Sequence, residues 1–133
     1  MKQNKFFKIL VCTLAVFMAM SATSLVSLAA VWTGGASSVA PSRTSDGFYL
    51  LQSAEDLAWF ANQINNDAGN VTMKGRLIED IYLNDVENND YSQIWTPIAD
   101  YSSTGRVFSG IFDGNGFTIY GMKVDSDKDY QGL

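Results

Sequence analysis

The chain has 133 residues, with 14 acidic and nine basic side chains, one cysteine and no histidine. Without histidine these residues contain no imidazole base and no histidine metal ligand, and a single cysteine cannot form an intramolecular disulfide. Many enzyme classes are thereby excluded for this segment.

The segment 1–30 is typical of a secretory signal peptide. Three lysines stand near its start, an uncharged apolar stretch runs from 9 to 28, and the small residues Ala29 and Ala30 follow. A positive start, an apolar middle and a small-residue cleavage site define such signals. The apolar stretch approaches the roughly 20 residues of a membrane-spanning helix, so an uncleaved anchor is the alternative. We predict that 1–30 is a signal peptide, whose removal takes Cys12 with it.

Loss of the signal peptide changes the charge balance. Three of the nine basic residues and none of the 14 acidic residues lie in 1–30, so six basic side chains remain and the formal charge is −8. A chain of this kind has no cluster of basic side chains to neutralise phosphates. We expect a secreted or cell-surface protein with no nucleic-acid partner, which meets a membrane only through its export signal.

Residues 31–46 consist mostly of Gly, Ser, Thr and Ala, with one Pro, and this composition predicts a flexible linker. The folded region is therefore expected to cover residues 47–133. It starts with Phe48 to Leu51, a short run of apolar residues that favour a β-strand.

A helix is predicted directly after this strand. Ser53 has the side chain of an N-cap residue, and Asp56 places a carboxylate at the positive end of the helix dipole. Apolar residues at spacings of three and four then form one face that ends by residue 65 or 66: Leu57, Phe60, Ala61 and Ile64. Trp59 lies off the centre of this face, where packing at the edge is favoured over a ligand platform.

The middle of the chain shows three features. In residues 76–83 the apolar phase slips around Glu79 and Asp80, and a bend between two short strands avoids burying a carboxylate. Residues 84–92 are polar and acidic, which predicts an exposed loop. Residues 95–98 contain Pro97, which restricts them to a sheet edge, a strand end or a corner.

Residues 107–124 carry two alternating apolar runs separated by Asp113-Gly114-Asn115-Gly116. Periodicity alone favours a β-hairpin, because both Asp-Gly and Asn-Gly supply the positive φ angles of hairpin turns. The alternative is a corner of a larger coil. In either case the expected turn residues are these: Gly110, Asp113, Gly114, Asn115, Gly116 and Gly121.

Five segments in this order, 46–51, 53–61, 80–83, 95–98 and 108–119, resemble the beginning of bacterial surface proteins that carry GLUG-motif repeats. The most distinctive of them is Phe-x-Gly-x-Phe-Asp-Gly-Asn-Gly, at 108–116. The resemblance implies a mainly β fold: the start of a right-handed parallel β-helix, with the helix capping its end and the short strands stacked as rungs. A small α+β domain with an antiparallel hairpin is the alternative.

The chain departs from that family at Ala99, where members often have glycine, and it stops at Gly132-Leu133, the first two letters of the motif. We therefore expect an amino-terminal piece of a longer chain, with downstream repeats of the same chain as its neighbours. Leu77, Ile98 and Ile119 recur at equal intervals, which is weak support for a repeat.

Two groups of aspartates suggest calcium binding or glycosidase catalysis, and each also has a simpler structural explanation. Asp125, Asp127 and Asp129 alternate as in a calcium loop, but Tyr130 stands where such a loop needs glycine. A solvated turn is favoured, so we expect no metal and no cofactor. Asp80 and Asp113 are the first pair to consider for glycosidase chemistry, although structural roles at corners are favoured and no catalytic residue is assigned.

The remaining hypothesis is binding. Tyr49, Trp59, Tyr101 and Tyr120 are aromatic residues that stack on sugars if they face solvent. We expect a non-catalytic cap and first rungs of an adhesin that binds host or environmental glycans or proteins. The alternative is the amino-terminal part of a carbohydrate-active enzyme or peptidase whose catalytic residues lie downstream.

Overall fold

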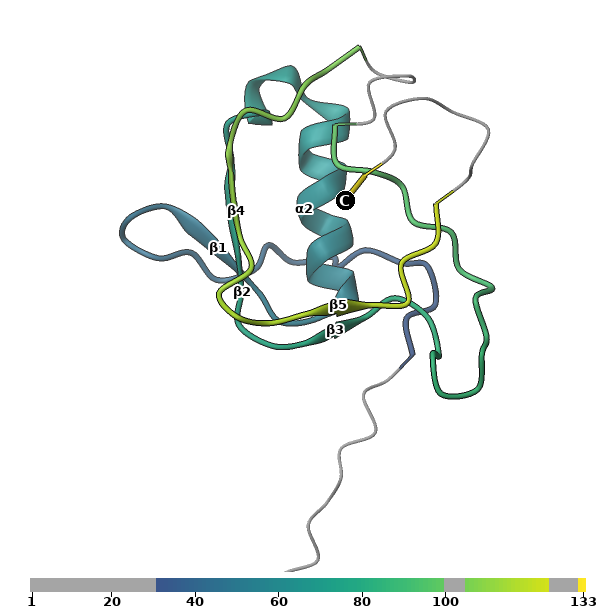
Figure 1. Cartoon of the computed structure of the whole chain (residues 1–133). Helices are drawn as coiled ribbons and strands as arrows, with labels where there is room; N and C mark the ends of the chain where they lie inside the picture. The colour runs from purple at the N-terminus through teal and green to yellow at the C-terminus, as the bar shows by residue number, and fades with distance from the viewer. Residues whose placement is uncertain (1–30, 100–104, 125–131) are drawn as a thin grey trace, which may run out of the picture.

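The computed structural model describes residues 31–99, 105–124 and 132–133. The predictions for 1–30, Tyr101 and the aspartates at 125, 127 and 129 lie outside these ranges. The elements follow one another as β1 (Phe48–Leu51), α2 (Ala54–Asn66), a 3-10 turn η1 (Ala68–Asn70), β2 (Lys74–Leu77), β3 (Ile81–Tyr82), β4 (Ile111–Asp113) and β5 (Ile119–Tyr120) (Figure 1). In the described residues no helix is long and apolar enough to cross a membrane.

The named strands form two short sheets in which every pairing is parallel. One sheet has the order β1-β2-β4, and the other pairs β3 with β5. Lys74 aligns with Ile111 in the first sheet, and Ile81 aligns with Ile119 in the second. The corner between β4 and β5 is therefore one residue longer than the corner between β2 and β3. The equal spacing of apolar residues noted in the sequence is not the spacing of the paired strands.

In Figure 1, β2 leads through a corner into β3, and β4 leads through a second corner into β5. The predicted bend in residues 76–83 is confirmed: β2 ends at Leu77, β3 begins at Ile81, and the residues between them include exposed Glu79 and Asp80. The phase slip in the sequence marks this corner because both buried residues, Leu77 and Ile81, then face the core.

The antiparallel hairpin, which is the local alternative at residues 113–116, is wrong. β4 and β5 flank this turn but belong to different sheets, and each pairs in parallel with an earlier strand. Asn115, with φ 47°, and Gly116, with φ 81°, do adopt the left-handed conformation that the turn residues predict. The local pattern cannot show that each flanking strand has a partner far earlier in the chain.

The second corner is attached to the first by side-chain hydrogen bonds. The Asn115 Nδ2 donates to the Leu77 carbonyl at 3.1 Å, and the Thr118 amide donates to Asp80 Oδ1 at 2.8 Å. Each bond joins the later corner to the equivalent place in the earlier one. The two corners therefore lie one upon the other, as the strands do.

Segment 95–98 is not in a strand, but its backbone runs beside later residues. The Trp95 amide donates to the Lys123 carbonyl at 2.6 Å, and the Ile98 amide donates to the Leu133 carbonyl at 2.9 Å. Pro97 has no amide to donate, and its carbonyl accepts a bond from Asn65 Nδ2.

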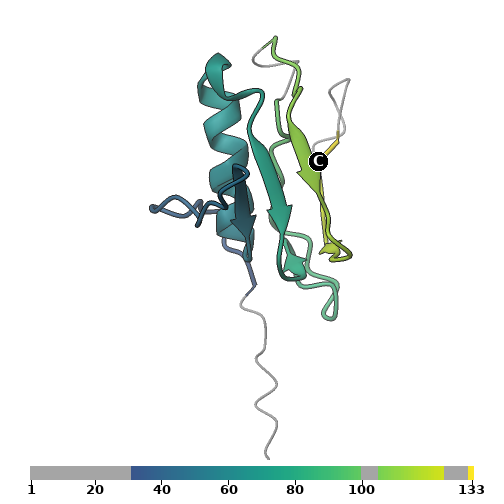
Figure 2. The same ribbon diagram turned by 90° about the vertical axis from the view of Figure 1, so that its left-hand side faces the viewer.

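Helix α2 begins at the predicted cap. The Ser53 side chain accepts a bond from the Asp56 amide at 3.2 Å, and Asp56 Oδ2 accepts one from the Gln52 amide. The predicted apolar face is buried, and the ring of Phe60 lies 6.2 Å from Phe108 and 6.3 Å from Phe112. In Figure 2 the helix lies at one side of the molecule, next to β1, and β2 and β4 follow in that order away from it.

Residues 31–46, predicted as a flexible linker, differ from that expectation. Trp32 is only 5% exposed and its ring lies 5.8 Å from that of Trp95. The Ser37 amide donates to the Glu55 carbonyl, and Arg43 forms an antiparallel bridge with Tyr49. A Gly- and Ser-rich composition gives no sign of this packing, because backbone hydrogen bonds hold much of the segment and its anchoring residue, Trp32, is a single apolar side chain near its start.

Asn84, predicted to start an exposed loop, is 1% exposed. Its Nδ2 donates to the carbonyls of Gln93 and Gly121, and its Oδ1 accepts from the Gln93 amide, all within 2.9 Å. A buried amide with its hydrogen bonds satisfied is tolerated in a core. Residues 87–92 are exposed, as predicted.

Glycine is required at two of the predicted turn positions. A Cβ at Gly110 would lie 1.9 Å from the Met73 carbonyl oxygen. A Cβ at Gly121, where φ is +69°, would lie 2.9 Å from the backbone nitrogen of Asn84. Both glycines therefore allow the backbone of the second strand pair to approach the first. Gly114 has neither a positive φ nor a close neighbour of this kind.

Candidate interaction surface

The two edges of the parallel sheet differ. On the outer edge of β1, the Leu50 amide donates to the Ser42 carbonyl and the Thr44 amide donates to the Phe48 carbonyl, both at 2.9 Å. These bonds form the short hairpin that projects from the sheet beside β1 in Figure 1. The unpaired groups of the first strand are thereby covered. We call this side, with residues 31–66, the closed end.

At the other side, β4 and β5 are the last strands of their sheets among the described residues. Four large apolar side chains of this region are exposed, by 68, 49, 37 and 44%: Val107, Ile111, Phe117 and Met122. A strand edge flanked by exposed apolar groups can pair with another strand. We call residues 107–122 the open end.

Asp113 presents a carboxylate at this edge. Its Oδ2 lies 2.7 Å from Nε of Arg76, its partner in register on β2, and its Oδ1 accepts the Asn115 amide. The hydrogen bond from Arg76 and then that from Asn115 lower the pKa of the Asp113 carboxyl from its usual value. The Asp113 side chain is 37% exposed, so solvent and further ligands reach it.

Tyr120 forms a ladder with Tyr82, its partner in register on β3. The ring centroids are 4.7 Å apart and the planes differ by 13°. This separation equals the spacing between neighbouring strands, so the ring faces point along the stacking direction. One face of Tyr120 is covered by Tyr82, and its other face points away from β3 toward the open end. Desolvation by burial, and to a smaller extent the electrostatic effect of Tyr120, raises the pKa of the Tyr82 phenol.

The stacking on Tyr82 argues against Tyr120 as a sugar-binding platform. Both faces of its ring point along the stacking direction, so neither is presented on the outer face of the sheet. Sequence reasoning misses Tyr82, the partner of Tyr120. A signal is present, since the dipeptide Ile-Tyr occurs at 81–82 and again at 119–120. A single recurring dipeptide does not reveal which strands pair, and the register of β3 with β5 supplies that information.

Two other predicted aromatic residues come together at the closed end. The rings of Tyr49 and Trp59 are 5.2 Å apart, and the Arg43 guanidinium lies 5.1 Å from the centroid of Tyr49. Both rings are partly buried against the core. This is the edge packing that the position of Trp59 predicts.

Asp80 and Asp113, the pair considered for catalysis, both act in corners. Asp80 accepts the Thr118 amide, while Asp113 is bonded to Arg76 and Asn115. A general acid needs a raised pKa, and that of Asp113 is lowered. Their arrangement is that of turn residues. Among the described residues no three acidic or cysteine side chains gather into a possible metal site.

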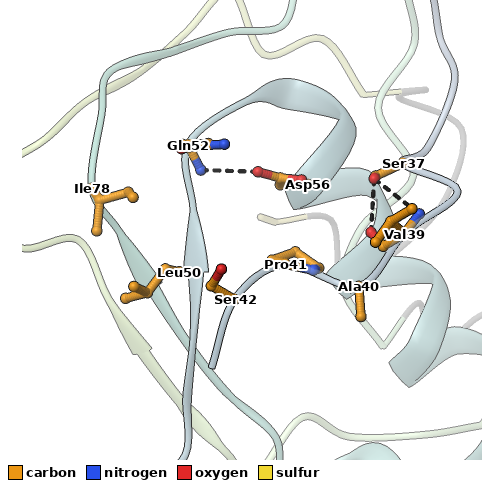
Figure 3. A pocket seen from close by; sticks show the side chains of 9 residues that line it. All are labelled: Ser37, Val39, Ala40, Pro41, Ser42, Leu50, Gln52, Asp56 and Ile78. Atoms are coloured by element: carbon orange, nitrogen blue, oxygen red, sulfur yellow. Dashed lines mark hydrogen bonds between the residues drawn. The ribbon is translucent and has the colours of Figure 1, made fainter. Parts of the chain in front are cut away.

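A shallow pocket of about 300 Å³ lies between residues 37–42 and the turn from β1 to α2 (Figure 3). Its single carboxylate, Asp56, caps the helix and accepts the Gln52 amide at 3.3 Å. The Ser37 hydroxyl donates to the Val39 carbonyl. Because these polar groups already serve local turns and only one carboxylate is present, the pocket offers no acid–base pair.

No family model matches this chain, and neither a curated protein nor a solved structure matches it. The resemblance to GLUG-repeat proteins therefore stays a prediction from the sequence. The candidate surface rests on the geometry of the open end within the described residues: a parallel edge without a further strand, four exposed apolar side chains, the Asp113 carboxylate and the outer face of Tyr120.

Proposed function

We propose that this chain is the non-catalytic cap and the first rungs of a right-handed parallel β-helix in a secreted or surface-exposed bacterial repeat protein, which acts in adhesion or ligand binding. The observation that carries the proposal is the difference between the closed end and the open end. Both sheets are parallel, and in the described residues only the β1 side of the larger sheet is covered by an antiparallel segment.

The closed end has the features of a terminal cap. The antiparallel residues 42–44 cannot continue a parallel ladder in the same sense, and α2 packs beside the first strand. A coil of stacked strands needs such a cap at its first strand, because an exposed edge promotes association with other chains. The open end, in contrast, exposes apolar groups that a following rung would cover.

A binding role rather than catalysis is supported by the use of the acidic side chains. Asp56, Asp80 and Asp113 each hold a backbone amide at a helix start or a corner. Carboxylates used in this way maintain the shape of the coil. The outer surfaces of the rungs are then available for ligands, which is the arrangement expected of an adhesin.

The cap is tested at Thr44, whose amide donates to the Phe48 carbonyl and whose Oγ1 accepts the Phe48 amide. Thr44→Pro removes the donor and exposes the edge of β1, so we expect concentration-dependent assemblies larger than those of the parent chain in sedimentation velocity. Thr44→Ala keeps the backbone donor and serves as the control. Equal sedimentation of the proline variant and the control would refute the capping role.

Export and binding need separate measurements. We expect the mature protein to begin at residue 30 or 31 when its amino terminus is sequenced after secretion. Binding is tested on arrays of glycans and extracellular proteins with the folded chain and its heat-denatured form. Retention of segment 1–30 in the exported protein contradicts the signal peptide, and equal signals from both forms contradict specific binding.

A further inference from the structure

We propose that the open end is a docking site for one kind of segment: a strand–corner–strand unit with a basic side chain in register with Asp113 and an aromatic ring in register with Tyr120. This inference rests on the proposed function and adds the chemistry of the occupant. It follows from the way the second strand pair docks on the first.

The existing contact between the two strand pairs shows what each position selects. Arg76 lies in register with Asp113 and forms an ion pair with it, and Tyr82 stacks on Tyr120. Ile81 aligns with Ile119 in the same ladder. The charged, aromatic and apolar positions therefore recur at fixed places in each strand–corner–strand unit. Cross-strand pairs of these kinds are the contacts that specify register in a sheet.

Asp113 determines the charge of the occupant. Arg76 contacts Oδ2 and the Asn115 amide contacts Oδ1, but a carboxylate has about four acceptor positions and this one is 37% exposed. A second cation placed one strand further along therefore finds both acceptor sites and negative charge. An acidic residue at that position would be repelled, so the charge order basic, acidic, basic is favoured along the stack.

Tyr120 determines the aromatic position. Its outer face points toward the open end, at the strand spacing that the ladder with Tyr82 already shows. A planar side chain in register covers this face with the same geometry. The exposed side chains of Ile111, Phe117 and Met122 supply further apolar area at the open end. Burial of these groups provides the attraction, and the Asp113 and Tyr120 contacts provide the selectivity.

A second copy of this chain fits the surface less well. Two copies would each bring the same acidic Asp113 edge, and each chain without 1–30 has a formal charge of −8, so charge repulsion disfavours their association. We therefore assign the site to a basic and aromatic strand unit.

The test uses a synthetic peptide with the sequence of residues 74–84, KGRLIEDIYLN, which carries Arg and Tyr at the required positions. It is titrated into the millimolar range against chain 31–133, with amide chemical shifts and anisotropy as readouts. We expect saturable binding with shifts concentrated in residues 107–122. Peptides with Arg76→Glu or Tyr82→Ser should bind about fivefold more weakly, the size expected for loss of one cross-strand pair.

Matched variants of the protein complete the design. Asp113→Asn keeps an acceptor for the Asn115 amide but removes the charge, so it should weaken binding of the parent peptide and leave the lower affinity of the Arg76→Glu peptide unchanged or raised. Glu55→Gln, in the first turn of α2 at the closed end, removes one charge elsewhere and should bind like the parent. Unchanged far-ultraviolet circular dichroism establishes that both variants fold.

Each outcome decides one question. Equal binding of all peptides at residues 107–122 overturns the assigned chemistry but leaves an open end, and with it the proposed function. Shifts confined to the β1 side, or no shifts at millimolar peptide, overturn the docking site itself. Self-association of the chain that the peptide does not reverse assigns the surface to a second copy instead. The cap test with Thr44→Pro is independent of all of these results.

Discussion

The closed end and the open end contain similar apolar side chains, yet they use them differently. At the closed end α2 covers the sheet, and Leu51, Leu57 and Phe60 have no exposed surface. At the open end Ile111 and Phe117 are 49 and 37% exposed. The difference shows that hydrophobicity alone does not decide whether a residue is buried. At the closed end, the antiparallel residues 42–44 protect the terminal strand by ending the parallel ladder.

The largest expected effect is a difference in stability between replacing a phenylalanine at the closed end and replacing one at the open end. Phe60→Ala removes a fully buried ring that contacts Phe108 and Phe112, so we expect a loss of about 3–5 kcal/mol in the free energy of unfolding. Phe117→Ala, at the open end, should cost less than about 1 kcal/mol because its ring is already partly in water. Urea denaturation of both variants measures the difference, and equal losses would mean that the open end is covered in solution.

Trp32→Ala tests whether residues 31–46 belong to the closed end. Loss of its contact with Trp95 and of its Nε1 bond to the Gly35 carbonyl should cost about 2–4 kcal/mol. Proteolysis should become faster within 31–46. Val39→Ala, at a side chain that is 71% exposed, is the control. Identical cleavage rates in the parent and the tryptophan variant would support a flexible linker instead.

Asn84 joins the first strand pair to the second, so it tests the connection between the ends. Asn84→Leu leaves the Gln93 and Gly121 backbone groups without their partners, which we expect to cost about 1–3 kcal/mol. Asn62→Ala, on the exposed side of α2, should change stability by less than about 0.5 kcal/mol. Thermal unfolding followed by circular dichroism compares the two. A silent Asn84→Leu variant would show that the amide network is dispensable.

The smallest effect concerns pH at the open end. The pKa of Asp113 is lowered in the folded chain by Arg76, so its stabilising contribution is present above the unfolded pKa and is lost as pH falls through the folded value. The difference in Tm between the parent chain and Asp113→Asn should therefore shrink as pH falls below about 4, the usual aspartate range. Because this pair is exposed, added salt should also reduce the difference. A difference that is constant from neutral pH to acid would rule out this ion pair as its source.

Several elements are predictable because their signals are local. Four consecutive apolar residues predict β1, the Ser53 cap and the spacing of Leu57 and Phe60 predict α2, and the phase slip at Glu79 predicts the corner between β2 and β3. The candidate surface is less predictable. The sequence draws attention to Tyr120 and Asp113, but for sugar stacking and catalysis, and it does not identify their partners Tyr82 and Arg76.

The errors have one physical cause. The hairpin at Asp113 to Gly116 is what the turn residues alone favour, and the linker is what Gly and Ser alone favour. Both preferences are small compared with the pairing of whole strands and the burial of an indole ring. The prediction of an exposed Asn84 fails for the same reason, since polarity predicts exposure unless distant backbone groups satisfy the amide.

The sequence by itself determined the places where the chain turns, the position of the helix and the strong excess of acidic side chains, because these depend on neighbouring residues and on composition. Only the tertiary structure decided that β4 pairs with β2 and β5 with β3, and that one edge is covered while the other, in the described residues, is not. Contacts between segments that are distant in the sequence determine which strands pair. Backbone amide and carbonyl groups are the same in every strand, so the sequence does not identify their partners.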